Sequence, residues 1–177
     1  MAAAAATGAG MTTEMDGGAI AAELLYREGQ LLDDRHWMDW LTLYTEDARF
    51  WIPAWIDEHE LTDDPDRQVS MIYITSRREL AERVSRTTSR KSVTAMPLPR
   101  TMHLVGNIQP VSVQPDRIVV RANGTVTSYH PRTATAHVIA ARYSYLLRFE
   151  EQQWRIASKK TVIINDRLPG MVDFYSI

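Results

Sequence analysis

The chain has 177 residues, a net charge of −2 and no cysteine, and 45% of its residues are hydrophobic. A chain of this length is typical of a single domain, which buries a sizeable core without disulfide bonds. The lack of cysteine excludes disulfides, thiol nucleophiles, thiolate zinc sites and iron–sulfur ligation within the chain. The net charge argues against a nucleic-acid binder and against a protein that binds acidic membranes.

The first 17 residues are predicted to form a flexible, alanine-rich leader, with a hinge at Gly17 and Gly18. This leader has no Lys or Arg before Glu14, so it lacks the basic region of a secretion signal. No apolar run reaches the roughly 20 residues that span a bilayer. We therefore expect a cytoplasmic protein with one folded domain over residues 18–177.

A first helix is predicted over residues 19–33. Its apolar stripe includes Leu24 and Leu31, and residues 27–29 are expected to form a polar turn. Asp33 and Asp34 are good N-cap candidates for a second helix. The buried face of that second helix has the spacing i, i+3, i+4 and i+7, and its members are Trp37, Trp40, Leu41 and Tyr44.

A strand is predicted next, over residues 48–53. Phe50 and Ile52 share one parity of this strand, and Trp51 has the other. A large aromatic side chain on the face opposite the core either closes a cavity or contacts a partner. The direction of Trp55, beyond the end of the strand, stays open.

Six acidic residues among residues 57–66 predict a solvated loop, and residues 69–75 predict a short strand. Ser76 followed by Glu79 has the capping-box pattern and predicts a helix over residues 77–90. The basic side chains of this helix are expected to form a solvated face.

Long strands are predicted from residue 100 onward, over residues 101–113, 117–130, 136–150 and 153–166. Asn123-Gly124 predicts either a hairpin turn or a bulge in one long bent strand, and spacing alone leaves both open. Helices followed by an antiparallel meander are typical of the α+β class, with helices packed on one face of a curved sheet.

Candidate chemistry in this sequence is sparse. His36, Asp39 and Asp47 are acidic or basic groups close to the tryptophans, but local capping and solvent exposure explain the two aspartates better than catalysis does. The five histidines show neither HxxxH nor HExxH spacing, so no metal site is predicted. No GxSxG, GxGxxG or Walker-type pattern is present.

Four stretches together resemble the small (β) subunits of aromatic-ring-hydroxylating dioxygenases. They are "LLDDRHWMDWLTLYTEDARFWIP", "RELAERVSR", "PRTMHLVGNI" and the closing "WRIASKKTVIIND…VDFYSI". Each is weak alone, but their order and spacing match the family over nearly the whole chain after residue 19. The residues of the first stretch resemble those of the family branch that acts on benzoate-like aromatic acids.

The resemblance implies a cone-shaped α+β fold of the nuclear-transport-factor (cystatin-like) type, and it favours one long bent strand at Asn123-Gly124. It also implies that this chain holds no cofactor and no catalytic residue. The partner α subunit is expected to carry a Rieske [2Fe–2S] cluster and a mononuclear iron, and to receive electrons from NADH through a reductase. Three α and three β subunits are expected to form a hetero-hexamer.

The resemblance also assigns residues to subunit contact. Arg100, His103 and Asn107 match a recurring family motif, which we expect to serve structure and contact. Trp51 and Trp55 are further expected contact residues. Two alternatives remain: a stand-alone isomerase or dehydratase of the same fold, using Asp47, Tyr44 or His103, and a module that binds small aromatic ligands.

Overall fold

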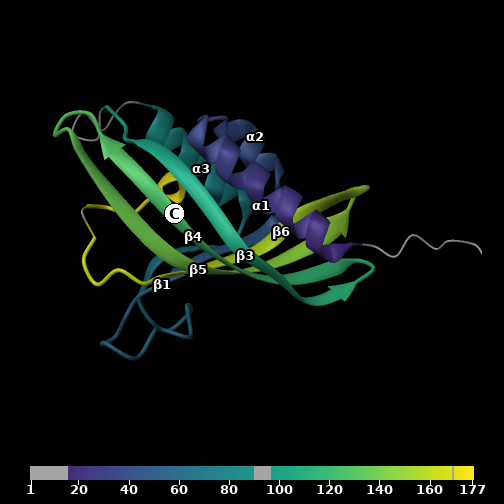
Figure 1. Ribbon diagram of the computed structural model, residues 1–177. Helices are drawn as coiled ribbons and strands as arrows, with labels where there is room; N and C mark the ends of the chain where they lie inside the picture. The colour runs from purple at the N-terminus through teal and green to yellow at the C-terminus, as the bar shows by residue number, and fades with distance from the viewer. Residues whose placement is uncertain (1–15, 90–96, 169) are drawn as a thin grey trace, which may run out of the picture.

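The computed structural model describes residues 16–89, 97–168 and 170–177, so the predicted flexibility of residues 1–15 falls outside it. Within the described residues, three helices lie together on one face of a curved six-stranded sheet (Figure 1). The C-terminal segment lies between these helices and the sheet. No helix in the described ranges is long and apolar enough to cross a membrane.

Helix α1 (Gly17–Asp33) begins inside the predicted leader, so Gly17 and Gly18 form its first turn and are not a hinge. The carboxylate of Asp16 caps it by accepting hydrogen bonds from the backbone N–H groups of Gly18 and Ala19. The apolar stripe faces the sheet as predicted, but Glu28 belongs to it and is only 2% exposed. Residues 27–29 are helical, as the predicted helix requires, but they do not form a solvent-facing polar turn, because Glu28 and Gly29 are buried.

Helix α2 (Trp37–Thr42) is short and begins after His36. The predicted N-caps are wrong, because α1 extends through Asp33 and Asp34 is its C-cap, with its N–H bonded to the oxygen of Gln30. Trp37 and Trp40 are buried as predicted. Tyr44 is buried too, but it is the first residue of strand β1 and lies beyond the helix.

Helix α3 (Arg77–Thr88) begins at the predicted cap. The hydroxyl of Ser76 accepts a hydrogen bond from the N–H of Glu79, and the Glu79 carboxylate accepts one from the N–H of Thr75. Its narrow apolar stripe packs into the core through Leu80 and Val84. The cap thus fixes where the chain turns from the sheet into the helix.

The six strands lie in the order β2-β1-β6-β5-β4-β3. They are β1 (Tyr44–Pro53), β2 (Ser70–Ile74), β3 (Arg100–Gln114), β4 (Arg117–His130), β5 (Thr135–Glu150) and β6 (Gln153–Ile163). The meander from β3 to β6 is antiparallel, as predicted. Strand β1, however, pairs with β6 in parallel, so the sheet is mixed. The last strand of the meander therefore closes against the first strand of the chain.

Alternate residues divide the sheet into an inner face toward the helices and an outer face. The inner residues of β1, β4 and β5 are almost fully buried; they include Phe50, Ile52, Ile118, Val120, Tyr143, Tyr145 and Leu147. Trp51 lies on the outer face, as its parity predicts. The inner face and the helices together form the core of the cone.

Asn123 and Gly124 lie within β4, which pairs with β5 without a shift in register. The hairpin alternative is therefore wrong, and the long strand is confirmed. The bulge lies instead in the neighbouring β3, where Asn107 has a φ of 50° and the register with β4 shifts. Asn tolerates this left-handed conformation better than most residues.

Gly124 is needed because the Tyr143 ring crosses over it. A Cβ at this position would come within 2.6 Å of Tyr143 Cε2 and 2.9 Å of the backbone oxygen of Leu104. We predict that Gly124→Ala lowers the free energy of unfolding by about 1–3 kcal/mol through overpacking. The control Gly106→Ala, where a Cβ meets nothing within 4 Å, should change it by less than about 0.5 kcal/mol. Equal effects of the two variants in urea unfolding would contradict this explanation.

Candidate functional site

An ion pair occupies the interior of the cone. Glu28 comes from the buried stripe of α1, and Lys159 comes from the inner face of β6. The Nζ of Lys159 lies 3.0 Å from Oε1 of Glu28, and each side chain is only 3% exposed. The hydroxyl of Tyr145 donates to Oε2 at 2.8 Å, and the hydroxyl of Tyr44 donates to Oε1. Every oxygen of the buried carboxylate thus has a partner, as a buried charge requires.

The ammonium group of Lys159 is also surrounded by aromatic rings. Its Nζ lies 5.6 Å from the ring centroid of Phe50, 5.2 Å from that of Tyr143 and 5.7 Å from that of Tyr145. The negative faces of such rings stabilise a cation in a low-dielectric interior. Lys159 also donates to the backbone oxygen of Ile177 at 3.5 Å. The charge is therefore held by the sheet and by the C-terminal segment together.

These surroundings set the protonation of the cluster. Burial raises the pKa of Glu28, but the charge of Lys159 and the hydrogen bonds that the carboxylate accepts outweigh burial and hold its pKa below 4.5. Burial and the charge of Glu28 raise the pKa of Tyr44 and Tyr145 well above 10. A general base works best with a pKa near the operating pH. This carboxylate is instead fully ionised and fully engaged, which suits a structural role.

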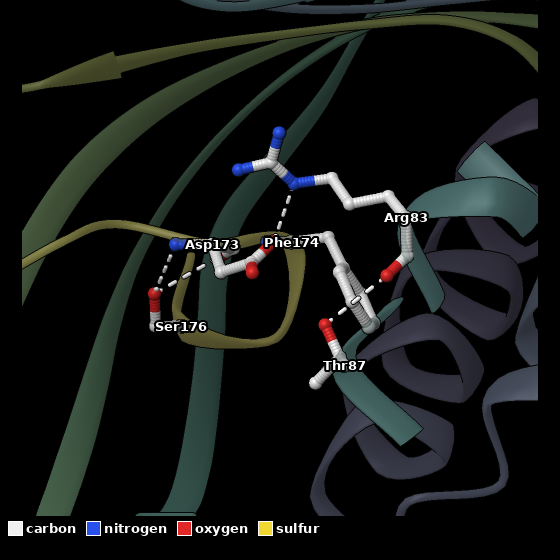
Figure 2. A network of polar contacts seen from close by, with 5 residues as sticks. All are labelled: Arg83, Thr87, Asp173, Phe174 and Ser176. Atoms are coloured by element: carbon white, nitrogen blue, oxygen red, sulfur yellow. Dashed lines mark hydrogen bonds and ion pairs between the residues drawn. The ribbon is translucent and has the colours of Figure 1, made fainter. Parts of the chain in front are cut away.

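The C-terminal segment closes the cone above this cluster, and Figure 2 shows how it is held. The carboxylate of Asp173 accepts a hydrogen bond from Nε of Arg83 on α3 at 2.5 Å and one from the N–H of Phe174 at 2.7 Å. The hydroxyl of Ser176 accepts from the N–H of Asp173 and donates to its backbone oxygen. One ion pair and a compact turn thus fix the segment against α3.

Phe174 fills the space between this turn and the helices. It is fully buried, with its ring stacked on Trp40 at 5.1 Å between centroids and set edge-on to Trp37 at 5.4 Å. The two tryptophans that periodicity placed on one helix face therefore bind the end of the chain. They serve packing, as their spacing predicts, and not an open aromatic pocket.

A second polar contact joins α1 to the edge strand β3. Nδ1 of His103 lies 2.6 Å from Oδ1 of Asp33, and the backbone N–H of His103 donates to Oδ2 at 2.8 Å. A carboxylate in the last turn of a helix lies near the negative end of the helix dipole, which is unfavourable. The hydrogen bonds with His103 offset this cost. Arg35 adds to the connection by donating to the backbone oxygens of Leu98 and Pro99. The chain between α1 and α2 is thereby tied to the start of β3.

A hollow of about 350 Å³ lies beside this contact, lined by Gly29 and Asp33 from α1 and by His103 and Val105 from β3, among others. Gly29 lets the helix approach closely, since a Cβ there would come within 3.1 Å of the Cβ of His103. Nε2 of His103 is buried, and within the described ranges it has no hydrogen-bond partner. Burial raises the pKa of Asp33, but its hydrogen bonds with His103 hold the pKa below 3.8.

The remaining expected contact residues lie in different places. The Trp51 indole N–H donates to the hydroxyl of Ser70 at 2.9 Å on the outer face. Trp55 is 38% exposed, and its indole N–H donates to the backbone oxygen of Ile163 at 2.7 Å. Arg100 is exposed at the start of β3, and Asn107 forms the bulge of that strand. The five expected contact residues therefore fall in two places, with Trp51 and Trp55 in and just after β1 and the other three on β3.

The candidates for a stand-alone enzyme do not meet in one site. Asp47 lies on the outer face of β1 and is paired with Arg148 of β5, whereas Tyr44 is bonded to Glu28 inside the cone. His103 is bonded to Asp33 at the edge strand. Asp39 is exposed in the first turn of α2, as expected. Among the residues in the described ranges, no three of the His, Asp and Glu side chains are grouped to hold a metal ion.

The pair of Glu28 and Lys159 is not predicted from the sequence, although each residue stands on the buried face of its element. Glu28 stands four residues after Leu24 and four before Leu32, on the buried stripe of an amphipathic helix. Lys159 has the inner parity of β6, two residues before the buried Thr161. A charged residue at an apolar position on two separate elements predicts a buried pair, but neither position alone identifies its partner.

We predict that Glu28→Gln lowers the free energy of unfolding by about 3–5 kcal/mol, because it leaves the Lys159 ammonium buried without a counter-charge. The double variant Glu28→Gln/Lys159→Met should be less destabilised than the sum of the two single variants. Glu82→Gln on the exposed face of α3 is the control, with an expected change below about 1 kcal/mol. Additive single effects in urea unfolding would contradict the coupling.

The Asp33–His103 contact predicts a pH dependence. Because the folded pKa of Asp33 lies below 3.8, its stabilisation is present above about pH 4 and is lost as the pH falls through the folded pKa. Asp33→Asn should therefore destabilise the chain at neutral pH, and the difference from wild type should shrink in acid. The exposed neighbour Asp34 provides the control, Asp34→Asn. A pH-independent difference in urea unfolding would refute this assignment.

Residues 27–170 match the family described as the ring hydroxylating beta subunit. The beta subunit of benzoate 1,2-dioxygenase from Acinetobacter baylyi is 35% identical over 156 residues, which are 88% of this chain and 91% of that protein. The crystal structure of the beta subunit of benzoate 1,2-dioxygenase from Burkholderia mallei is 33% identical, with a TM-score of 0.77, over 93% of this chain and 99% of that chain.

An NTF2-like protein with a cystatin-like fold from Novosphingobium aromaticivorans is 15% identical, with a TM-score of 0.57, over 84% of this chain and 82% of that chain. This likeness concerns the fold alone, and it confirms the expected α+β fold of the nuclear-transport-factor type. The family match covers most of the chain, and it agrees with the four motifs and with the architecture. This chain belongs to the family of beta subunits of aromatic-ring-hydroxylating dioxygenases.

Proposed function

We propose that this chain is the non-catalytic β subunit of a cytoplasmic dioxygenase that acts on a benzoate-like aromatic acid in aromatic catabolism. The partner α subunit carries the Rieske [2Fe–2S] cluster and the mononuclear iron, and three α subunits assemble with three β subunits. The identity of about one third to benzoate 1,2-dioxygenase beta subunits supports the substrate class.

The filled interior of the cone is the observation that carries the non-catalytic role. An isomerase or dehydratase of this fold needs a base that a substrate can reach in the cavity. Here the buried carboxylate of Glu28 is bonded to Lys159 and to two tyrosine hydroxyls, and Lys159 also contacts the backbone oxygen of Ile177 in the C-terminal segment. The interior therefore supports a rigid scaffold, and the outer surfaces remain for contact with other subunits.

The subunit contacts proposed from the sequence are Trp51, Trp55, Arg100, His103 and Asn107. The exposed side chain of Arg100 and the partly exposed Trp51 and Trp55 are available for direct contact. The side chain of His103 is only 4% exposed, so we assign it the positioning of β3 through Asp33. Asn107 acts in the same way by shaping the bulge of β3.

Co-expression with the α subunit tests the proposed function. We predict that the isolated chain contains no iron and turns over no aromatic acid, and that it co-elutes with the α subunit as an active benzoate-oxidising complex. The measurements are iron content, size-exclusion chromatography and oxygen uptake with benzoate. Stoichiometric iron in the isolated chain, or no association on co-expression, would contradict the proposal.

Two tryptophans give this experiment a matched pair of variants. Trp40 is fully buried, so Trp40→Ala should lower the free energy of unfolding by about 3–5 kcal/mol. Trp51→Ala should instead weaken assembly more than it destabilises the isolated chain, because Trp51 lies on the outer face. Equal thermal destabilisation by both variants with unchanged assembly would overturn this division.

A further inference from the structure

A row of side chains crosses the outer face of the sheet, and its charge is positive. The pairing register aligns Arg121 of β4, Ser144 of β5, Lys160 of β6, Trp51 of β1 and Tyr73 of β2. The Nζ of Lys160 lies 4.0 Å from the centroid of the Trp51 ring. We call these residues, with Arg49 and Arg142, the basic row.

The positive charges of the basic row lack acidic partners. Arg142 lies diagonally beside Arg121 and Lys160, two positions along β5 from Ser144, and Arg49 lies two positions before Trp51. Within the described ranges, none of these four cations forms an ion pair. Like charges at neighbouring positions of a sheet destabilise it. This face is therefore complementary to an acidic surface.

An acidic surface is present on the same chain, in the loop between β1 and β2. This loop projects from the sheet on the side away from the helices (Figure 1). It contains six acidic residues among residues 57–66, which we call the acidic loop. Two backbone hydrogen bonds close the base of this loop: the N–H of Ile56 donates to the oxygen of Glu60 at 2.8 Å, and the N–H of Thr62 donates to the oxygen of Ala54 at 2.9 Å. The indole N–H of Trp55 donates to the backbone oxygen of Ile163, which joins the base of the acidic loop to β6.

Part of the charge on the acidic loop is free to bind. Asp57 accepts hydrogen bonds from backbone N–H groups within the loop, and Asp64 is paired with Arg67. Within the described ranges, the exposed carboxylates of four residues have no partner: Glu58, Glu60, Asp63 and Asp66. The connection between β1 and β2 also exposes two apolar side chains, Ile56 at 52% and Val69 at 78%. Charge and apolar area are both available for a contact.

We infer that the acidic loop of one copy of this chain docks on the basic row of a second copy. The loop and the row are different surfaces, so every copy offers both, and the contact repeats from copy to copy until a ring closes. This inference deepens the proposed function and rests on it for the expectation of several β subunits in one assembly. It assigns the charges of the outer face to contact between β subunits.

Charge reversal of each surface in the full-length chain tests the inference. In Arg121→Glu/Arg142→Glu two of the four cations of the basic row become anions, and in Glu58→Lys/Glu60→Lys two of the six acidic residues of the acidic loop become cations. Each variant alone should self-associate about tenfold or more weakly than wild type in sedimentation equilibrium at low salt. A mixture of the two variants should associate more strongly than either variant alone, because the introduced lysines of one variant then meet the introduced glutamates of the other.

Arg27→Glu/Arg86→Glu is the matched control. Both arginines are exposed on the helices, and their reversal changes the net charge by the same amount as reversal of the row. This control should keep the self-association of wild type. A wild-type chain that stays monomeric, reversed variants that associate like wild type, or a mixture that fails to associate would each overturn the inference.

Binding of the α subunit distinguishes a failure of this inference from a failure of the proposed function. If the reversed-row variant loses the α subunit while the isolated chain self-associates normally, the row binds the α subunit and the inference is wrong. If the wild-type chain self-associates but never binds the α subunit, the proposed function fails and the contact between copies stands. Circular dichroism of each variant verifies that the fold is intact.

Discussion

The buried pair of Glu28 and Lys159 is the constraint on which the rest of the cone depends. Two charges removed from water are tolerated only where other groups satisfy them fully. Here the hydroxyls of Tyr44 and Tyr145 complete the carboxylate, and aromatic rings surround the ammonium group. The pair joins the first helix to the last strand, so elements from opposite ends of the chain must be in place before either charge is satisfied.

Contacts inside the fold join the four sequence motifs in pairs. The first and third motifs meet through Asp33 and His103, and the second and fourth meet through Arg83 and Asp173. Each motif thus contributes one side of a tertiary contact. The contacts hold helix α1 against the edge strand β3 and helix α3 against the C-terminal turn.

The two faces of the sheet serve different purposes. The inner face carries tyrosines, a carboxylate and an amine, which are residue types common in active sites, but here they are buried and hydrogen-bonded to one another. On the outer face, Lys160 and the neighbouring arginines are left without acidic partners within the described residues. This arrangement, with a hydrogen-bonded interior and these unpaired charges on the outer face, is what the proposed supporting role requires.

The sequence by itself determined the α+β class, the Ser76 cap and the long strands, because these depend on local periodicity and capping patterns. It also indicated the family, through the order of four motifs along the chain. The parity of β1 also placed Trp51 on the outer face. Only the tertiary structure decided that Glu28 faces Lys159, that Asp34 ends α1, and that the bulge belongs to Asn107 and not to Gly124. These features depend on which segments meet across the sheet, and a one-dimensional pattern does not contain that pairing. The basic row depends most on this pairing, because the row exists only when the register of five strands brings its residues side by side.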